Sequence, residues 1–138
     1  MTWTISTVLA LCMTMTPDPV PFKAIETGMQ TGIERAREAV VRTPAEWKTL
    51  CGEYAEGRPC PTIDFSKTTV IGVFLGTRPT AGYSVQVTKV ERDGDAIVVT
   101  YREGKPGPDV MAAQMLTTPY QLVSIDRVNG PIRFVRAR

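Results

Sequence analysis

One apolar run places the strongest limit on how this chain can fold. Residues 69–76, TVIGVFLG, form a continuous apolar stretch of strand length that contains several β-branched side chains. Such a run is typical of a strand that is buried on both faces, rather than of a strand with one wet face. The sequence therefore predicts a central strand at these residues.

A β-hairpin is expected after this run. Val85 and Val87 alternate with polar residues, and Ile97 and Val99 alternate in the same way on the return. The dipeptide Asp93-Gly94 between the two segments is a strong turn signal. The spacing predicts two antiparallel strands joined by a tight turn.

A short helix is expected from Pro44 to about Ala55. The Thr43 hydroxyl can cap free amides, Pro44 suits the first helical position, and Glu46 stands at the capping-box site. Apolar residues then recur at three- and four-residue spacing, namely Trp47, Leu50, Cys51 and Tyr54. We therefore expect one face of this helix to pack on a sheet, with Trp47 as a core anchor.

Other short segments have the pattern of strands separated by turns. They lie at residues 22–33, which form one strand or two short ones, and at 38–42, 110–117, 120–128 and 132–135. The strand-helix alternation that a parallel sheet requires is absent from the pattern. The predicted fold class is α+β and mostly β: an antiparallel sheet, sandwich or partly open barrel of about seven strands with one packed helix.

Length and composition limit the function classes. A chain of 138 residues, 43% hydrophobic and 22% charged, suits one globular domain. It has no histidine, which removes Ser-His and Cys-His nucleophile pairs and HExxH zinc sites. No two of its three cysteines have CxxC spacing. A net charge of +2 gives little electrostatic attraction to nucleic acid. We therefore expect no enzyme activity, metal, cofactor or nucleic-acid partner.

The first residues raise the question of a leader. Residues 3–15 are mostly apolar or small and are followed by closely spaced prolines, as in some export signals, but they include no early Lys or Arg. The segment is too short to span a bilayer, and Leu11 does not suit lipid modification of Cys12. We expect residues 1–21 to be a leader or a flexible arm without a lipid anchor at Cys12, and residues 22–138 to be one β-rich domain.

Cys51 and Cys60 enclose a loop that contains glycine and proline. In an oxidising compartment, a disulfide between them would stabilise the fold by about 2.5 to 3 kcal/mol. The alternative is a pair of small, half-buried thiols. A disulfide and an exported protein would support each other.

The loop from Thr77 to Ser84 is the candidate binding site. Its proline stiffens the backbone, its Gly82 allows unusual dihedral angles, and its tyrosine and arginine are the side-chain types that most often anchor protein interfaces. The candidate contact residues are Arg78, Pro79, Thr80, Gly82 and Tyr83. The alternative is an ordinary connection whose Tyr83 folds back into the core.

The order of several motifs resembles the carboxyl-terminal domain of the protease complex subunit PrcB family. The motifs are TPAEW from Thr43, IDFS from Ile63, VIGVFLGTRPTAGYSV from Val70, the hairpin, Gly107-Pro108 and LTTPY from Leu116. The likeness extends from Thr43 to Val135. It departs from the family pattern at Ala81, where a second glycine is common, and at Cys51, where tryptophan is common. The resemblance implies an exported or lipid-anchored, non-catalytic protein that binds a protein partner, and the family name suggests a protease as the class of that partner.

A shorter resemblance concerns the candidate loop alone. The residues from Arg78 to Tyr83 are similar to the proline-threonine-glycine-tyrosine loop of chagasin-like cysteine protease inhibitors, which wedges into a protease cleft. Here Arg78 replaces the leading asparagine, and no tryptophan follows Tyr83. This resemblance also implies a stiff loop that strands present to a protein.

These points predict a non-enzymatic protein-binding domain, extracytoplasmic or associated with the cell envelope, that presents the loop from Thr77 to Ser84. Two alternatives are a protease inhibitor that uses the loop as a wedge and a structural cell-envelope module in which Tyr83 is buried. A cytoplasmic location is the alternative to export. The arginines at the carboxyl end, Arg127, Arg133, Arg136 and Arg138, are expected to protect an edge strand from aggregation.

Overall fold

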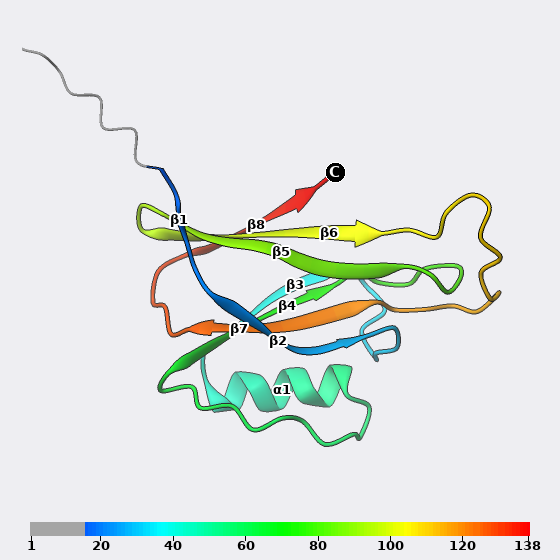
Figure 1. Cartoon of the computed structure of the whole chain (residues 1–138). Coiled ribbons are helices and arrows are strands. Elements are labelled where there is room, and N and C mark those ends of the chain that lie inside the picture. The colour runs from blue at the N-terminus through cyan, green and yellow to red at the C-terminus, as the bar shows by residue number, and fades with distance from the viewer. Residues whose placement is uncertain (1–15) are drawn as a thin grey trace, which may run out of the picture.

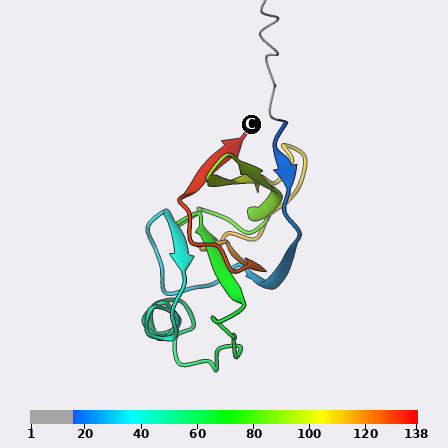
Figure 2. The same cartoon turned by 90° about the vertical axis from the view of Figure 1, so that its left-hand side faces the viewer.

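Two four-stranded sheets and one helix form three layers in the computed structural model, which describes residues 16–138 (Figure 1). The outer sheet has the strand order β1-β5-β6-β8, and the central sheet has the order β2-β7-β4-β3. Helix α1 covers the face of the central sheet that points away from the outer sheet (Figures 1 and 2). The elements are β1 (Asp18–Pro19), β2 (Phe22–Gly28), β3 (Arg37–Val41), α1 (Pro44–Tyr54), β4 (Thr68–Phe74), β5 (Ser84–Asp93), β6 (Ala96–Gly104), β7 (Tyr120–Asp126) and β8 (Ile132–Ala137).

The central strand expected at the apolar run is β4, which lies between two hydrophobic cores. Val70 and Phe74 contribute to the core beneath α1, while Ile71 and Val73 contribute to the core between the sheets. All four side chains are at most 2% exposed. Because successive residues of a strand point to opposite faces, a strand shared by two cores must be apolar throughout. The prediction of a strand buried on both faces is confirmed.

The predicted helix forms with the expected cap. The Glu46 amide donates a 3.2 Å hydrogen bond to the Thr43 hydroxyl, and that hydroxyl lies 3.0 Å from Glu46 Oε1. The buried face carries Trp47, Leu50 and Tyr54. Trp47 Nε1 donates a 3.0 Å hydrogen bond to the carbonyl of Pro61, so its buried polar atom is satisfied. The helix is therefore fixed both at its start and along its inner face.

The predicted hairpin is the β5–β6 pair, and Gly94 in its turn has φ +60°. A bulge at Thr88 interrupts the pairing, since Val87 lies opposite Tyr101 and Lys89 opposite Thr100. The Val87 amide donates a 2.6 Å hydrogen bond to Oε1 of buried Gln121 in the central sheet. The bulge thus allows a hydrogen bond between the two sheets, and the Val87 amide and the buried Gln121 side chain satisfy each other.

Residues 110–117 are not the strand that the sequence analysis predicted. They form part of a long loop between β6 and β7, and only Thr117 makes an isolated bridge, to Arg78. The segment VMAAQMLT contains mainly alanine, methionine and glutamine, which have weak strand propensity. Its first seven residues join no sheet.

Two further details differ from the predicted pattern. β8 is an edge strand, but it pairs in parallel with β6, because the chain enters it from the central sheet after β7. The fold also begins before Phe22, where the domain was expected to start, since Asp18 and Pro19 pair with β5 and the Val20 amide donates to the carbonyl of Val90. Residues 1–15, including Cys12, lie outside the described part of the chain, so the leader prediction stays a prediction.

Candidate functional site

The loop from Thr77 to Ser84 is bonded to the loop between β6 and β7 at one end of the sandwich (Figure 1, right). The amide of Arg78 donates to the carbonyl of Thr117 at 2.7 Å, and the reverse bond is 3.0 Å long. The Ala81 amide donates to the carbonyl of Ala113 at 3.0 Å, and the Thr117 hydroxyl donates to the carbonyl of Thr80 at 2.9 Å. Two irregular loops therefore stabilise each other, and we name this region the loop end.

The connection between β2 and β3 completes the loop end. The Thr118 amide donates a 2.8 Å hydrogen bond to the carbonyl of Met29, and the Thr31 amide donates a 2.8 Å bond to the Thr118 hydroxyl. The amide of Thr77 donates to the carbonyl of Glu34 at 3.0 Å. Three segments far apart in the sequence thus share one network of main-chain hydrogen bonds.

The Arg78 side chain points into the protein rather than toward a partner. Its Nε donates a 2.6 Å hydrogen bond to Glu103 Oε1, and its Nη1 donates a 2.9 Å bond to the carbonyl of Leu75. The Glu103 side chain is only 5% exposed and also pairs with Arg136 of β8. The bond from Arg78 is the main reason that the pKa of Glu103 lies below its usual range. Arg78 therefore acts as an internal anchor of the loop.

The other predicted contact residues differ in exposure. Pro79 and Gly82 are exposed, whereas Thr80 and Tyr83 are half-buried. Gly82 has φ +94°, and a Cβ atom there would lie 2.9 Å from the Pro106 side chain, so glycine suits this position for two reasons. Tyr83 belongs to neither hydrophobic core cluster. The structure thus brings these residues together at the surface, where Pro79 and Gly82 are the exposed members of the set.

Five exposed apolar side chains that the sequence analysis missed, which we name the apolar patch, lie on two segments of the loop end. Val110 is 63% exposed, Met111 100% and Leu116 69%, and Met29 and Met115 are each 44% exposed. Single exposed apolar side chains are common, but five on adjoining segments of one end mark a candidate contact surface. Methionine suits such surfaces because its flexible thioether adapts to different partners. The weak strand propensity of residues 110–117 could have indicated that this segment is a loop, whose apolar side chains would then be exposed.

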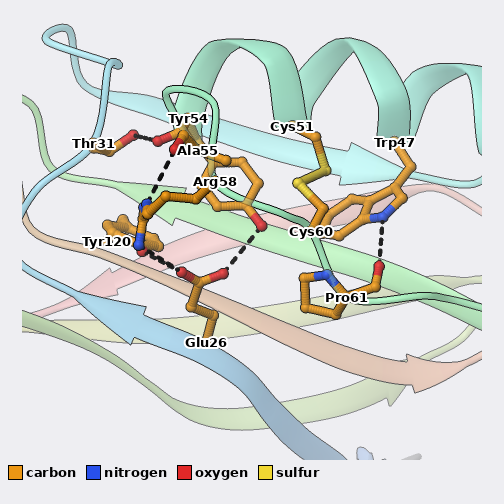
Figure 3. Close-up of a disulfide and its surroundings, with 10 residues drawn as sticks. All are labelled: Glu26, Thr31, Trp47, Cys51, Tyr54, Ala55, Arg58, Cys60, Pro61 and Tyr120. Carbon is orange, nitrogen blue, oxygen red and sulfur yellow. Dashed lines mark hydrogen bonds and ion pairs between the residues drawn. A yellow bond between two sulfur atoms is a disulfide. The ribbon is translucent and has the colours of Figure 1, made fainter.

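A second cluster, also missed, centres on Glu26 in β2 (Figure 3). Its carboxylate accepts hydrogen bonds from the Tyr54 hydroxyl at 3.1 Å and the Tyr120 hydroxyl at 2.7 Å, and it pairs with Arg58 at 3.4 Å. Burial, followed by the nearby Glu26 charge, raises the pKa of Tyr54 above its usual range. Burial, followed by the bond to Glu26, raises the pKa of Tyr120 in the same direction. The cluster ties the helix layer to the central sheet.

Cys51 and Cys60 form a disulfide next to this cluster (Figure 3). Their Cα atoms are 6.2 Å apart, which is within the range that a disulfide can bridge. The bridge closes the loop that carries Arg58, whose Nε donates a 3.0 Å hydrogen bond to the carbonyl of Ala55. The disulfide therefore limits the positions that Arg58 can take relative to Glu26.

Within residues 16–138, no group of three or more His, Cys, Asp or Glu side chains could hold a metal ion. No helix in the same part has both the length and the apolar character needed to cross a membrane.

The layers, the disulfide and the loop end define a mostly β sandwich domain with one exposed apolar end. The model of the family described as PrcB C-terminal matches residues 69–126, which confirms the predicted resemblance to this family. The matched segment runs from β4 to β7 and contains the loop from Thr77 to Ser84 and every residue of the apolar patch except Met29. No curated protein and no solved structure matches the chain.

Proposed function

We propose that this domain is a non-enzymatic module that binds another protein through its loop end. The observation that carries the proposal is the exposure of Val110, Met111 and Leu116 on a loop that is bonded to Thr80 and Ala81. A surface that is already ordered loses little conformational entropy on binding, so its apolar area contributes more fully to affinity. Pro79 and Gly82 extend this surface, while Arg78 holds it from within.

We also propose that the protein acts outside the cytoplasm. The disulfide between Cys51 and Cys60 supports this location, because disulfides persist mainly in oxidising compartments. The likeness to the PrcB C-terminal family supports a protein as the partner, and a protease is the partner class that the family name suggests. The absence of histidine from the chain is consistent with a role without catalysis.

A capture experiment tests the role of the loop end. The wild-type protein, a Met111→Ser/Leu116→Ser double variant and a Val135→Ser control are immobilised and exposed to an extract of the source cell envelope. Val135 is a suitable control because it is 43% exposed and lies on β8 opposite Thr100 of β6, outside the three connections that form the loop end. We expect the double variant to retain about one tenth or less of the specific capture, and the control to retain all of it. Equal capture by all three proteins would refute the proposal.

Protease inhibition is the second candidate function, because Pro79 and Gly82 of the loop are exposed. A panel of cysteine and serine proteases separates the two functions, since a binding subunit leaves the rate of substrate cleavage unchanged and an inhibitor lowers it. Tyr83→Ala separates both from a structural role. A structural role predicts a large loss of stability and no selective loss of capture.

A further inference from the structure

Within residues 16–138, three of the four sheet edges carry features that disfavour pairing with another strand. β1 has only two residues, one of which is Pro19. β2 contains a bulge between Ala24 and Glu26, and β8 carries Arg133 and Arg136. Short length, proline, bulges and charges are the usual means by which proteins protect sheet edges.

β3 has neither a proline nor a bulge, and its two charged residues, Arg37 and Glu38, stand at its start. Arg37–Val41 pairs with β4 residue by residue, without a register shift, and the strand ends in Ala39-Val40-Val41. Within residues 16–138, no main-chain hydrogen bond outside the sheet ladders uses a group of residues 37–41. An edge strand directs half of its amides and carbonyls away from its neighbour, so this edge offers free pairing groups.

β3 and α1 lie on the same side of the molecule (Figure 2). Residues of both elements line a groove. It has a volume of about 370 Å³ and is lined by β3 and by Glu46, Thr49 and Leu50 of the helix. Val41 and Leu50 are buried apolar residues in its lining, while Glu46 and Thr49 are exposed. The groove can therefore accept apolar side chains from a strand that pairs with β3.

The charges around the groove indicate the chemistry of its partner. Arg37 is neutralised by an ion pair with Glu53 of α1. Glu38 accepts a 2.8 Å hydrogen bond from Tyr101, and Glu46 contacts the Thr43 hydroxyl, but neither carboxylate forms an ion pair within the described residues. Among the residues that line the groove, the uncompensated charge is therefore negative, and it favours a basic partner.

We propose that β3 and α1 form a docking groove for an extended, basic segment of a protein partner, which adds to the central sheet as a fifth strand. Main-chain hydrogen bonds to β3 provide affinity, and alternate apolar side chains enter the groove beside Val41 and Leu50. Lysine or arginine residues of the segment pair with Glu38 and Glu46. This surface is separate from the apolar patch of the loop end, so the two can act independently.

A library of random peptides displayed on phage is the probe for this groove. The wild-type protein is expected to enrich peptides in which every second residue is apolar and which contain lysine or arginine. Binding of a synthetic enriched peptide should slow hydrogen exchange at the amides of residues 37–41. Glu46→Gln should weaken the binding severalfold, because it removes one carboxylate and keeps the side-chain shape.

Two variants block the groove in different ways. Val40→Lys places a charge on the strand edge, and Thr49→Tyr fills the groove from an exposed helix position. We expect each variant to weaken peptide binding about tenfold or more. Val135→Lys, which places the same charge on the β8 edge, should have no effect, and neither should Tyr83→Ala at the loop end. Thr49→Tyr decides the outcome if Val40→Lys does not fold.

Several outcomes would overturn the inference. One is the failure of the wild-type protein to enrich any peptide above the level of Thr49→Tyr. Another is peptide binding that protects amides of the loop end instead of residues 37–41. A third is a dimer of the wild-type protein that Val40→Lys dissociates, because β3 would then pair with a second copy of this chain. Loss of envelope capture in the loop-end variants bears only on the proposed function and leaves the groove untouched.

Discussion

The Tyr120 hydroxyl of β7 donates a 2.7 Å hydrogen bond to Oε1 of Glu26 in β2, and both residues lie beneath α1. Tyr120 is 1% exposed, so its hydroxyl has few alternatives to this acceptor. Tyr54 of the helix donates to the other oxygen of the same carboxylate. One carboxylate thus satisfies two buried hydroxyls that come from different layers.

Removal of this carboxylate should destabilise the fold. Glu26→Ala leaves the Tyr54 and Tyr120 hydroxyls without their acceptor. A hydrogen bond to a charged group contributes about 1.5 to 3 kcal/mol to stability. We expect the free energy of unfolding, measured in urea, to fall by about 2 kcal/mol or more. Glu56→Ala is the matched control, because Glu56 is exposed. Equal small losses in both variants would show that the cluster contributes little.

Stability should fall at alkaline pH, in part through Tyr101. Burial, followed by its hydrogen bond to Glu38, raises the pKa of Tyr101 to about 12, whereas an unfolded tyrosine has a pKa of about 10. The contribution of this residue is fully present below about pH 10 and is lost as the pH rises through about 12. Urea unfolding across this window should show a shallower decline in Tyr101→Phe than in the wild type. Identical slopes would contradict the raised pKa.

Loss of the disulfide should destabilise the protein without changing its fold. The bridge between Cys51 and Cys60 closes a short loop, for which the chain-entropy model gives about 2.5 to 3 kcal/mol. We expect the free energy of unfolding of a Cys51→Ser/Cys60→Ser variant, measured in urea, to be lower by that amount. The wild type under reducing conditions should behave in the same way. Trp47 fluorescence provides a local measurement, since its indole donates to the carbonyl of Pro61, next to Cys60.

Gly82→Ala should destabilise the loop end more than a comparable glycine substitution elsewhere. Gly82 and Gly57 both have positive φ, at +94° and +84°, so alanine is strained at either site. At Gly82 the new Cβ would also lie 2.9 Å from Pro106, whereas nothing lies within 4 Å at Gly57. We expect Gly82→Ala to cost roughly 1 kcal/mol more than Gly57→Ala in thermal or urea unfolding. A smaller loss at Gly82 would show that the loop relaxes freely.

Local sequence patterns were sufficient to predict most of the fold. Thr43, Pro44 and Glu46 mark the start of the helix through short-range contacts, and the apolar run of β4 reflects burial on both faces. The parallel direction of β8 could not be predicted, because it depends on the crossing of the chain from one sheet to the other after β7. That crossing leaves no periodic signal in residues 127–131.

The candidate site was predicted only in part. Pro79 and Gly82 are exposed as a contact loop requires, but the internal role of Arg78 depends on Glu103, which is 25 residues away in the sequence. The Glu26 cluster joins residues from β2, the loop after α1 and β7, and no spacing rule relates such positions. A bulge at Ile25 also changes the direction in which Glu26 points. Side-chain networks of this kind become visible only when the strands are placed in space.

Four of the connections between consecutive elements carry the chain from one sheet to the other: those from β1 to β2, β4 to β5, β6 to β7 and β7 to β8. The chain thus crosses between the two sheets four times, and neither sheet can unfold as a unit while the other stays intact. Two of these crossings lie at the loop end. We therefore expect the two sheets to unfold together in a single cooperative step.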